Sequence, residues 1–113
     1  MLMPMVRNNN FNIFLNKNIY LFYMLRDLQK YLVEFVGTLF FIFIIITTGN
    51  PLAIGASLYI VILLGGQISG GHFNPAVSVA MTVLGKLQKK DLGFYIFAQV
   101  LGGLFAWQIS KMI

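Results

Sequence analysis

Residues 68–77 read ISGGHFNPAV, and this stretch decides the fold. A helix does not run through it, because the paired glycines leave the backbone free and Pro75 has no N–H to donate. Asn74 is a good N-cap residue and Pro75 suits a first helical position, so a second helix is expected over 75–84. At 1.5 Å per residue this helix is about 15 Å long, half the thickness of a bilayer core. The stretch therefore predicts a re-entrant loop followed by a half helix.

Apolar stretches of membrane-spanning length lie on both sides of this loop. The sequence is 58% hydrophobic and 10% charged, with a mean hydropathy of +0.81, which is typical of a membrane protein. Helices are expected over about residues 25–47, 51–68 and 92–110, and each has about the length that crosses a hydrocarbon core. The sequence predicts an all-α membrane protein with three transmembrane helices plus one re-entrant half helix.

Residues 1–24 are expected to form a poorly ordered N-terminal tail ahead of the repeat at 25–111. Asn and Lys interrupt the apolar residues of this segment without a helical period. One alternative is an amphipathic segment that lies on the lipid headgroups. Another is that the true start of the chain is Met24.

Side chains that carry chemistry are scarce. The 113 residues include no cysteine, one histidine and three acidic residues, too few for a metal, cofactor or acid–base site. We therefore expect no enzyme, no cofactor and no bound metal. The formal net charge is +5, but the basic residues lie between apolar runs instead of clustering on a soluble surface. No nucleic-acid partner is expected either.

The basic residues indicate how the chain is oriented in the membrane. Seven of the eight Lys and Arg residues precede the first or the third expected spanning helix, and they share one side if 75–84 returns to the side it left. The positive-inside rule assigns that side to the cytoplasm. We expect an integral, multi-pass protein with its N-terminus in the cytoplasm and its C-terminus on the outer face; which membrane holds it does not follow from the sequence. The seven are Arg7, Lys17, Arg26, Lys30, Lys86, Lys89 and Lys90.

Two more segments carry information besides the loop: residues 33–38 read VEFVGT, and residues 97–103 read FAQVLGG. Together with 68–77 they resemble one family, the aquaporin and glycerol-facilitator channels, also called major intrinsic proteins. The resemblance covers about residues 31–111 and matches the N-terminal half of such a channel, which carries one of two inverted Asn-Pro-Ala repeats. It implies half of an aquaporin-like fold.

The resemblance also implies roles for the polar groups of the loop. A half helix that starts at the membrane midplane directs the positive end of its dipole into the pore, against cations and protons. Glu34 would brace the loop by accepting from its backbone N–H groups with Gln99 nearby; the alternative is a carboxylate that reaches back toward Lys30. Ile54 falls at the outer constriction, and the His72 ring is expected to meet a backbone group. The expected pore-lining residues are Asn74, Pro75, Ala76, Gly70, Gly71, His72 and Ile54.

The function that the resemblance implies is channel-type passive transport of water or small neutral solutes. Because one repeat does not enclose the family's pore, we expect a half-aquaporin subunit that needs a partner to close it. The expected partners are the lipid bilayer, the solute, and either further copies of the chain or a complementary half-channel. Two alternatives stay open: an interaction protein that assembles with or blocks a complete aquaporin, and a truncated relic that transports nothing.

Overall fold

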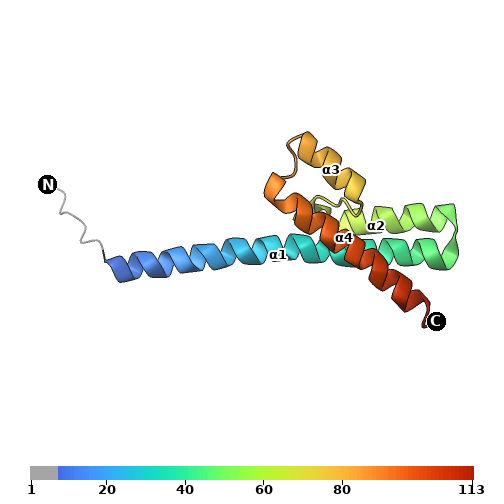
Figure 1. Ribbon diagram of the computed structural model, residues 1–113, viewed down its shortest axis with the longest axis horizontal. Coiled ribbons are helices and arrows are strands. Elements are labelled where there is room, and N and C mark those ends of the chain that lie inside the picture. The colour runs from blue at the N-terminus through green and yellow to red at the C-terminus, as the bar shows by residue number, and fades with distance from the viewer. Residues whose placement is uncertain (1–7) are drawn as a thin grey trace.

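The computed structural model describes residues 8–113, and every regular element in that range is a helix (Figure 1). The elements are α1 (Asn9–Thr48), α2 (Pro51–Ser69), α3 (Pro75–Val83) and α4 (Lys89–Ser110). Helices α1, α2 and α4 are long and apolar enough to cross a membrane, whereas α3 has nine residues. The predicted fold class, three spanning helices and one half helix, is confirmed.

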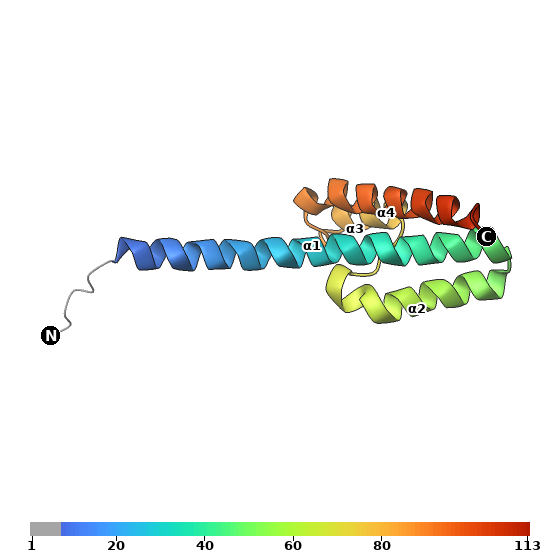
Figure 2. The ribbon, with the colours of Figure 1, turned by 90° about the horizontal axis from the view of Figure 1, so that it is seen from below.

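Helix α1 is much longer than the sequence predicted. It has 40 residues, a length of about 60 Å, and its first half projects beyond the other helices (Figures 1 and 2). The side chain of Asn8 caps its start by accepting from the backbone N–H of Asn10. With no Gly or Pro between Asn8 and Gly37, the helix extends outward from its packed part. The expectation of a poorly ordered tail is therefore wrong for residues 9–24; residues 1–7 lie outside the described part.

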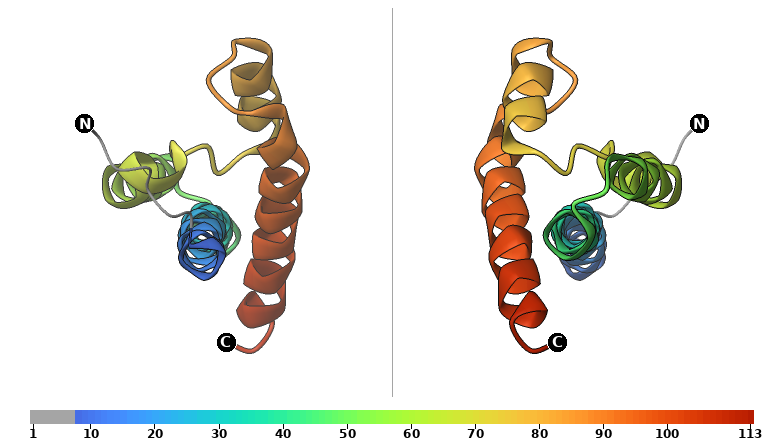
Figure 3. Two further views of the ribbon diagram at one scale, coloured as in Figure 1. Left: turned by 90° about the vertical axis from the view of Figure 1, so that its left-hand side faces the viewer. Right: turned by 90° about the vertical axis from the view of Figure 1, so that its right-hand side faces the viewer.

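Helix α1 lies between α2 and α4, which pack on different sides of it (Figure 3). Gly49, in the left-handed conformation, ends α1, and Asn50 caps α2, so these two helices form an antiparallel pair. After the loop at 70–74, α3 runs back toward the end of the molecule where α2 finished and lies beside α4 (Figure 1). The C-terminus and the α1–α2 turn are at the same end (Figure 2). This path is that of a re-entrant segment.

Glycines allow α1 to approach its neighbours closely. A Cβ atom on Gly102 of α4 would lie 2.6 Å from the carbonyl oxygen of Phe35 and 3.1 Å from the backbone nitrogen of Leu39. A Cβ atom on Gly65 of α2 would lie 2.6 Å from the Val33 side chain. Small residues at helix contacts are a general feature of membrane proteins, because packing and not apolar burial holds the helices together there.

Gly102→Ala should destabilise the protein, because the obstructing atoms belong to the α1 backbone and do not move aside. Overpacking of this kind costs about 1–3 kcal/mol. Gly103→Ala is the matched control, since the nearest atom to its Cβ would be Ile42 Cγ1 at 3.9 Å. Thermal unfolding in detergent should show a lower midpoint for Gly102→Ala alone. Equal midpoints for the two variants would contradict the close α1–α4 contact.

Candidate functional site

The carboxylate of Glu34 lies at the centre of the molecule and is completely buried. Its Oε1 accepts from Ser69 Oγ at 2.7 Å and from the backbone N–H of His72 at 2.9 Å. Its Oε2 accepts from the backbone N–H of Phe73 at 2.7 Å and from Gln99 Nε2 at 3.0 Å. One side chain of α1 is thus bonded to α2, the loop and α4.

This arrangement satisfies both the carboxylate and the loop. A buried carboxylate is costly unless it is hydrogen-bonded, and here it accepts four bonds. The loop needs acceptors, because positive φ angles at Gly70 (92°), Gly71 (66°) and Phe73 (52°) break the helical hydrogen-bond ladder. Lys30, the other partner considered for Glu34, bonds to Asp91 at 3.1 Å instead. The Glu34 carboxylate is therefore stabilised by four hydrogen bonds and not by an ion pair with Lys30.

Phe73 holds the loop from the other side and was not singled out from the sequence. It is the one non-glycine residue with a positive φ among residues 8–113, and its side chain is 2% exposed. Its ring lies against Gly37 of α1, where a larger residue would collide with it, and at ordinary contact distance from Gly65 of α2. The buried ring offsets the cost of the left-handed backbone. The sequence carried no local signal for this role, because the contact between Phe73 and Gly37 joins residues far apart in the chain.

A second group of buried polar side chains connects the loop to α3 and α4. Ser78 Oγ lies 2.9 Å from His72 Nδ1 and accepts from Gln99 Nε2 at 2.8 Å. Tyr95 donates its hydroxyl to the carbonyl oxygen of Ser69 at 2.6 Å. The expectation of a backbone partner for the His72 ring is wrong: the ring meets the Ser78 hydroxyl, which α3 brings within reach. Sequence reasoning missed Ser69, Ser78 and Tyr95, although buried polar groups in apolar helices require partners.

Asn74 stands at the start of α3. Its Oδ1 accepts from the backbone N–H of Ala76 at 2.8 Å, the ordinary N-cap bond, and Pro75 occupies the first turn. The Asn74 side chain is exposed, so its amide N–H₂ group faces out of the bundle with its donors unused by residues 8–113. The residue therefore combines a helix cap with an outward-facing donor.

The remaining predicted pore-lining residues fall in two places. Gly70, Gly71 and His72 form the irregular loop segment before Asn74. No N–H or O–H group of residues 8–113 donates to their carbonyl oxygens. Ile54 is half-buried in the first turn of α2, about 22 Å along that helix from Ser69. The described residues contain no group of acidic or histidine side chains that could hold a metal ion. The loop thus offers donors at Asn74 and free acceptors ahead of it.

Comparison with known proteins identifies the family to which this loop and its brace belong. The sequence model of the family described as major intrinsic protein matches residues 22–113. The chain belongs to the major intrinsic protein family. It is 40% identical over 88 residues to a glycerol uptake facilitator protein-like 6 of Lactiplantibacillus plantarum, over 70% of the chain and 41% of that protein.

Two further relatives carry aquaporin names. The chain is 41% identical over 96 residues to aquaporin-8 of Mus musculus, over 75% of the chain and 37% of that protein. It is 49% identical over 65 residues to aquaporin Z of Brucella melitensis, over 58% of the chain and 28% of that protein. The chain spans about two fifths of the length of the first two relatives.

Glu34→Leu should lower the stability of the protein, because the N–H groups of His72 and Phe73 lose their acceptor in a buried place. Each unpaired group costs about 1–3 kcal/mol. Thr38→Val, one turn further along α1, is the control: Thr38 is buried and its hydroxyl has no partner among the described residues. In detergent melts we expect a clear drop in midpoint for the first variant and an unchanged or higher one for the second. An unchanged midpoint for Glu34→Leu would show that the loop does not need the carboxylate.

Proposed function

We propose that the chain supplies half of a passive pore for water or a small uncharged solute. The observation that carries the proposal is the half helix α3, which starts at Asn74 directly after the loop braced by Glu34 and presents an exposed amide there. Irregular backbone within the hydrocarbon core of a membrane is tolerated where it lines a cavity or is buried in protein. Membership of the major intrinsic protein family supports channel-type transport as the use of this arrangement.

Each part of the loop has a role in the proposed pathway. The carbonyl oxygens of Gly70, Gly71 and His72 accept hydrogen bonds from a passing hydroxyl and replace part of its hydration. The amide of Asn74 donates to the same solute. The first N–H groups of α3 carry partial positive charge, and this charge opposes cations and protons. Residues 68–85 include no Asp, Glu, Lys or Arg, so no fixed charge traps the solute.

A complementary half is needed to enclose this pathway. The described residues supply one half helix, and the chain spans about two fifths of relatives that are named as glycerol facilitators and aquaporins. We propose that a second half helix enters from the opposite side of the membrane. An antiparallel pair of identical chains fits this less well, because seven of eight basic residues favour one orientation. A different chain is the better candidate for the second half.

One further observation favours an assembly role, as a protein that joins or blocks a complete channel. At most 28% of the residues in the most apolar window of each spanning helix are buried within the chain. Large apolar faces are therefore left for lipid or for another protein. This second candidate needs no transport by the chain, so flux measurements distinguish it from the first.

The proposed orientation has the N-terminus in the cytoplasm and the C-terminus outside. The chain contains no cysteine, so single cysteines placed by Lys86→Cys and Ile113→Cys can be labelled without interference. An impermeant maleimide added to intact cells should label the position at 113 directly and the position at 86 only after permeabilisation. The reverse pattern would overturn the proposed orientation, and labelling of both positions from outside would contradict the re-entrant path.

The proposed transport predicts little swelling of proteoliposomes that hold the chain alone and clear swelling when a matching second half is present. Asn74→Asp should then lower solute flux or admit cations, because a carboxylate offsets the positive end of α3. Asn50→Asp is the matched control, since Asn50 caps α2 at the turn far from the loop. Stopped-flow light scattering measures the swelling of the proteoliposomes for both variants. Strong flux from the chain alone would refute the need for a partner, and no flux in any combination would refute transport.

A further inference from the structure

Two hollows of different chemistry lie one after the other along the contact between α1 and α2. We propose that together they bind one anionic phospholipid, its phosphate in the first hollow and an acyl chain in the second. The first, here called the polar pocket, has a volume of about 440 Å³ and lies between α1, the end of α2 and the start of α4. The second, the apolar groove, has a volume of about 530 Å³. This proposal is independent of transport.

The polar pocket has an excess of positive charge. Arg26, Lys30 and Lys90 line it together with one carboxylate, Asp27. Asp27 lies 2.9 Å from Lys30 and 3.2 Å from Lys90, and Lys30 also reaches the buried Asp91 at 3.1 Å. Two carboxylates thus face three cations, which leaves one positive charge for a ligand.

Arg26 is the cation without a carboxylate partner among residues 8–113. Its guanidinium lies over the ring of Phe22, 5.8 Å from the ring centroid, and the side chain is exposed. A guanidinium can bind a phosphate with two parallel hydrogen bonds. This geometry matches a phosphate better than the single ammonium of a lysine does. Gln29, Gln67 and Gln88 add neutral amide donors around the same hollow. The pocket is therefore suited to a single phosphate.

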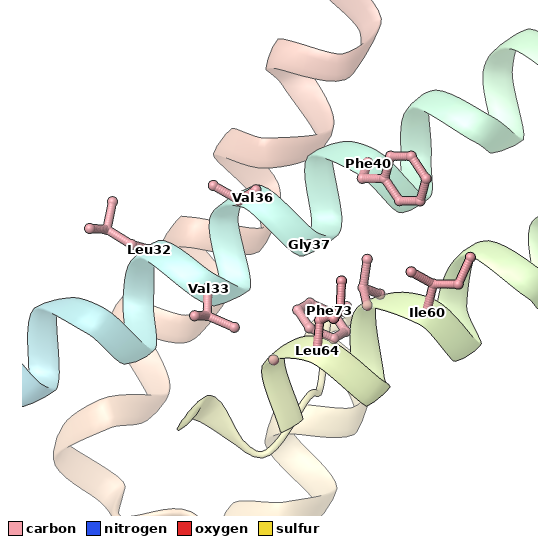
Figure 4. Close-up of a pocket in the computed structure, with 10 residues that line it drawn as sticks. Leu32, Val33, Val36, Gly37, Phe40, Ile60, Leu64 and Phe73 are labelled. Carbon is pink, nitrogen blue, oxygen red and sulfur yellow. The ribbon is translucent and has the colours of Figure 1, made fainter. Parts of the chain in front are cut away.

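The apolar groove lies next to the polar pocket along both helices. On α1 it starts at Leu32, three residues after Gln29, and on α2 it ends at Gly65, two residues before Gln67. Its wall is formed by aliphatic side chains and Phe40, with Gly37 and Phe73 at its floor (Figure 4). Leu64 and Val36, on opposite sides of the groove, are 75% and 58% exposed. Because the groove lies within the spanning helices, an acyl chain fits it.

The order of the two hollows identifies the ligand as a lipid. Both antiparallel helices place the polar groups at the same end and the apolar surface next to it, which matches a headgroup above its chains. Lys86 and Lys89, exposed just before and at the start of α4, add to the positive field at that end. A Lys or Arg near an anionic membrane surface contributes about fivefold to binding. A free phosphate would use the pocket but gain nothing from the groove.

Lipid binding to the full chain is measured by native mass spectrometry in a non-ionic detergent. The probes are phosphatidylglycerol and phosphatidylcholine with identical acyl chains, and glycerol phosphate as the soluble headgroup. We expect the wild type to prefer phosphatidylglycerol, and Arg26→Gln and Lys90→Gln to lose about fivefold in affinity for it. Lys89→Gln removes the same charge next to Lys90 but does not line the pocket, so it should lower the affinity less than Lys90→Gln does.

A groove variant tests the second half of the proposal. Val36→Phe fills the apolar groove and should weaken both lipids alike while the preference for phosphatidylglycerol persists. Circular dichroism of each variant confirms that the helices are intact. Equal losses for Lys89→Gln and Lys90→Gln, or no preference between the two lipids, would overturn the site. Competition by glycerol phosphate as strong as that by the lipid would assign the pocket to a free phosphate.

Discussion

The carboxylate of Glu34 is the group on which the rest of the structure depends. A chain that enters the membrane and returns must leave the helical conformation there, and the backbone groups it frees have no water to bond. Glu34 supplies two acceptor oxygens to the backbone of His72 and Phe73 at that point. Since the same carboxylate also binds Ser69 and Gln99, the position of the loop is fixed relative to α2 and α4.

Close helix packing and this buried network depend on each other. Gly102 brings α4 against the α1 backbone, and that contact carries Gln99, three residues earlier, into reach of Glu34. Gly37 leaves the space that the Phe73 ring fills, so the strained residue of the loop is held by apolar contact as well as by a hydrogen bond. As a result Asn74 faces outward at the start of α3.

The helices and the break between α2 and α3 could largely be predicted from local sequence. Apolar runs of spanning length gave three helices, and Gly70, Gly71 and Pro75 required the break and the short helix after it. The helical state of residues 9–24 could not be predicted, because no apolar period marks them and their helix continues from the packed part of α1. The positive φ of Phe73 and the polar partners Ser78 and Tyr95 depend on tertiary contacts. No pattern along a single helix records such contacts.

Amide hydrogen exchange, resolved by residue with NMR on the protein in bilayers, tests the central claim most directly. The N–H groups of His72 and Phe73 bond to a buried carboxylate, whereas that of Asn74, the next residue, has no acceptor among residues 8–113. The account predicts that the first two amides exchange as slowly as those in the middle of α4, while the Asn74 amide exchanges fast. Equally fast exchange at all three positions would contradict a loop held by Glu34.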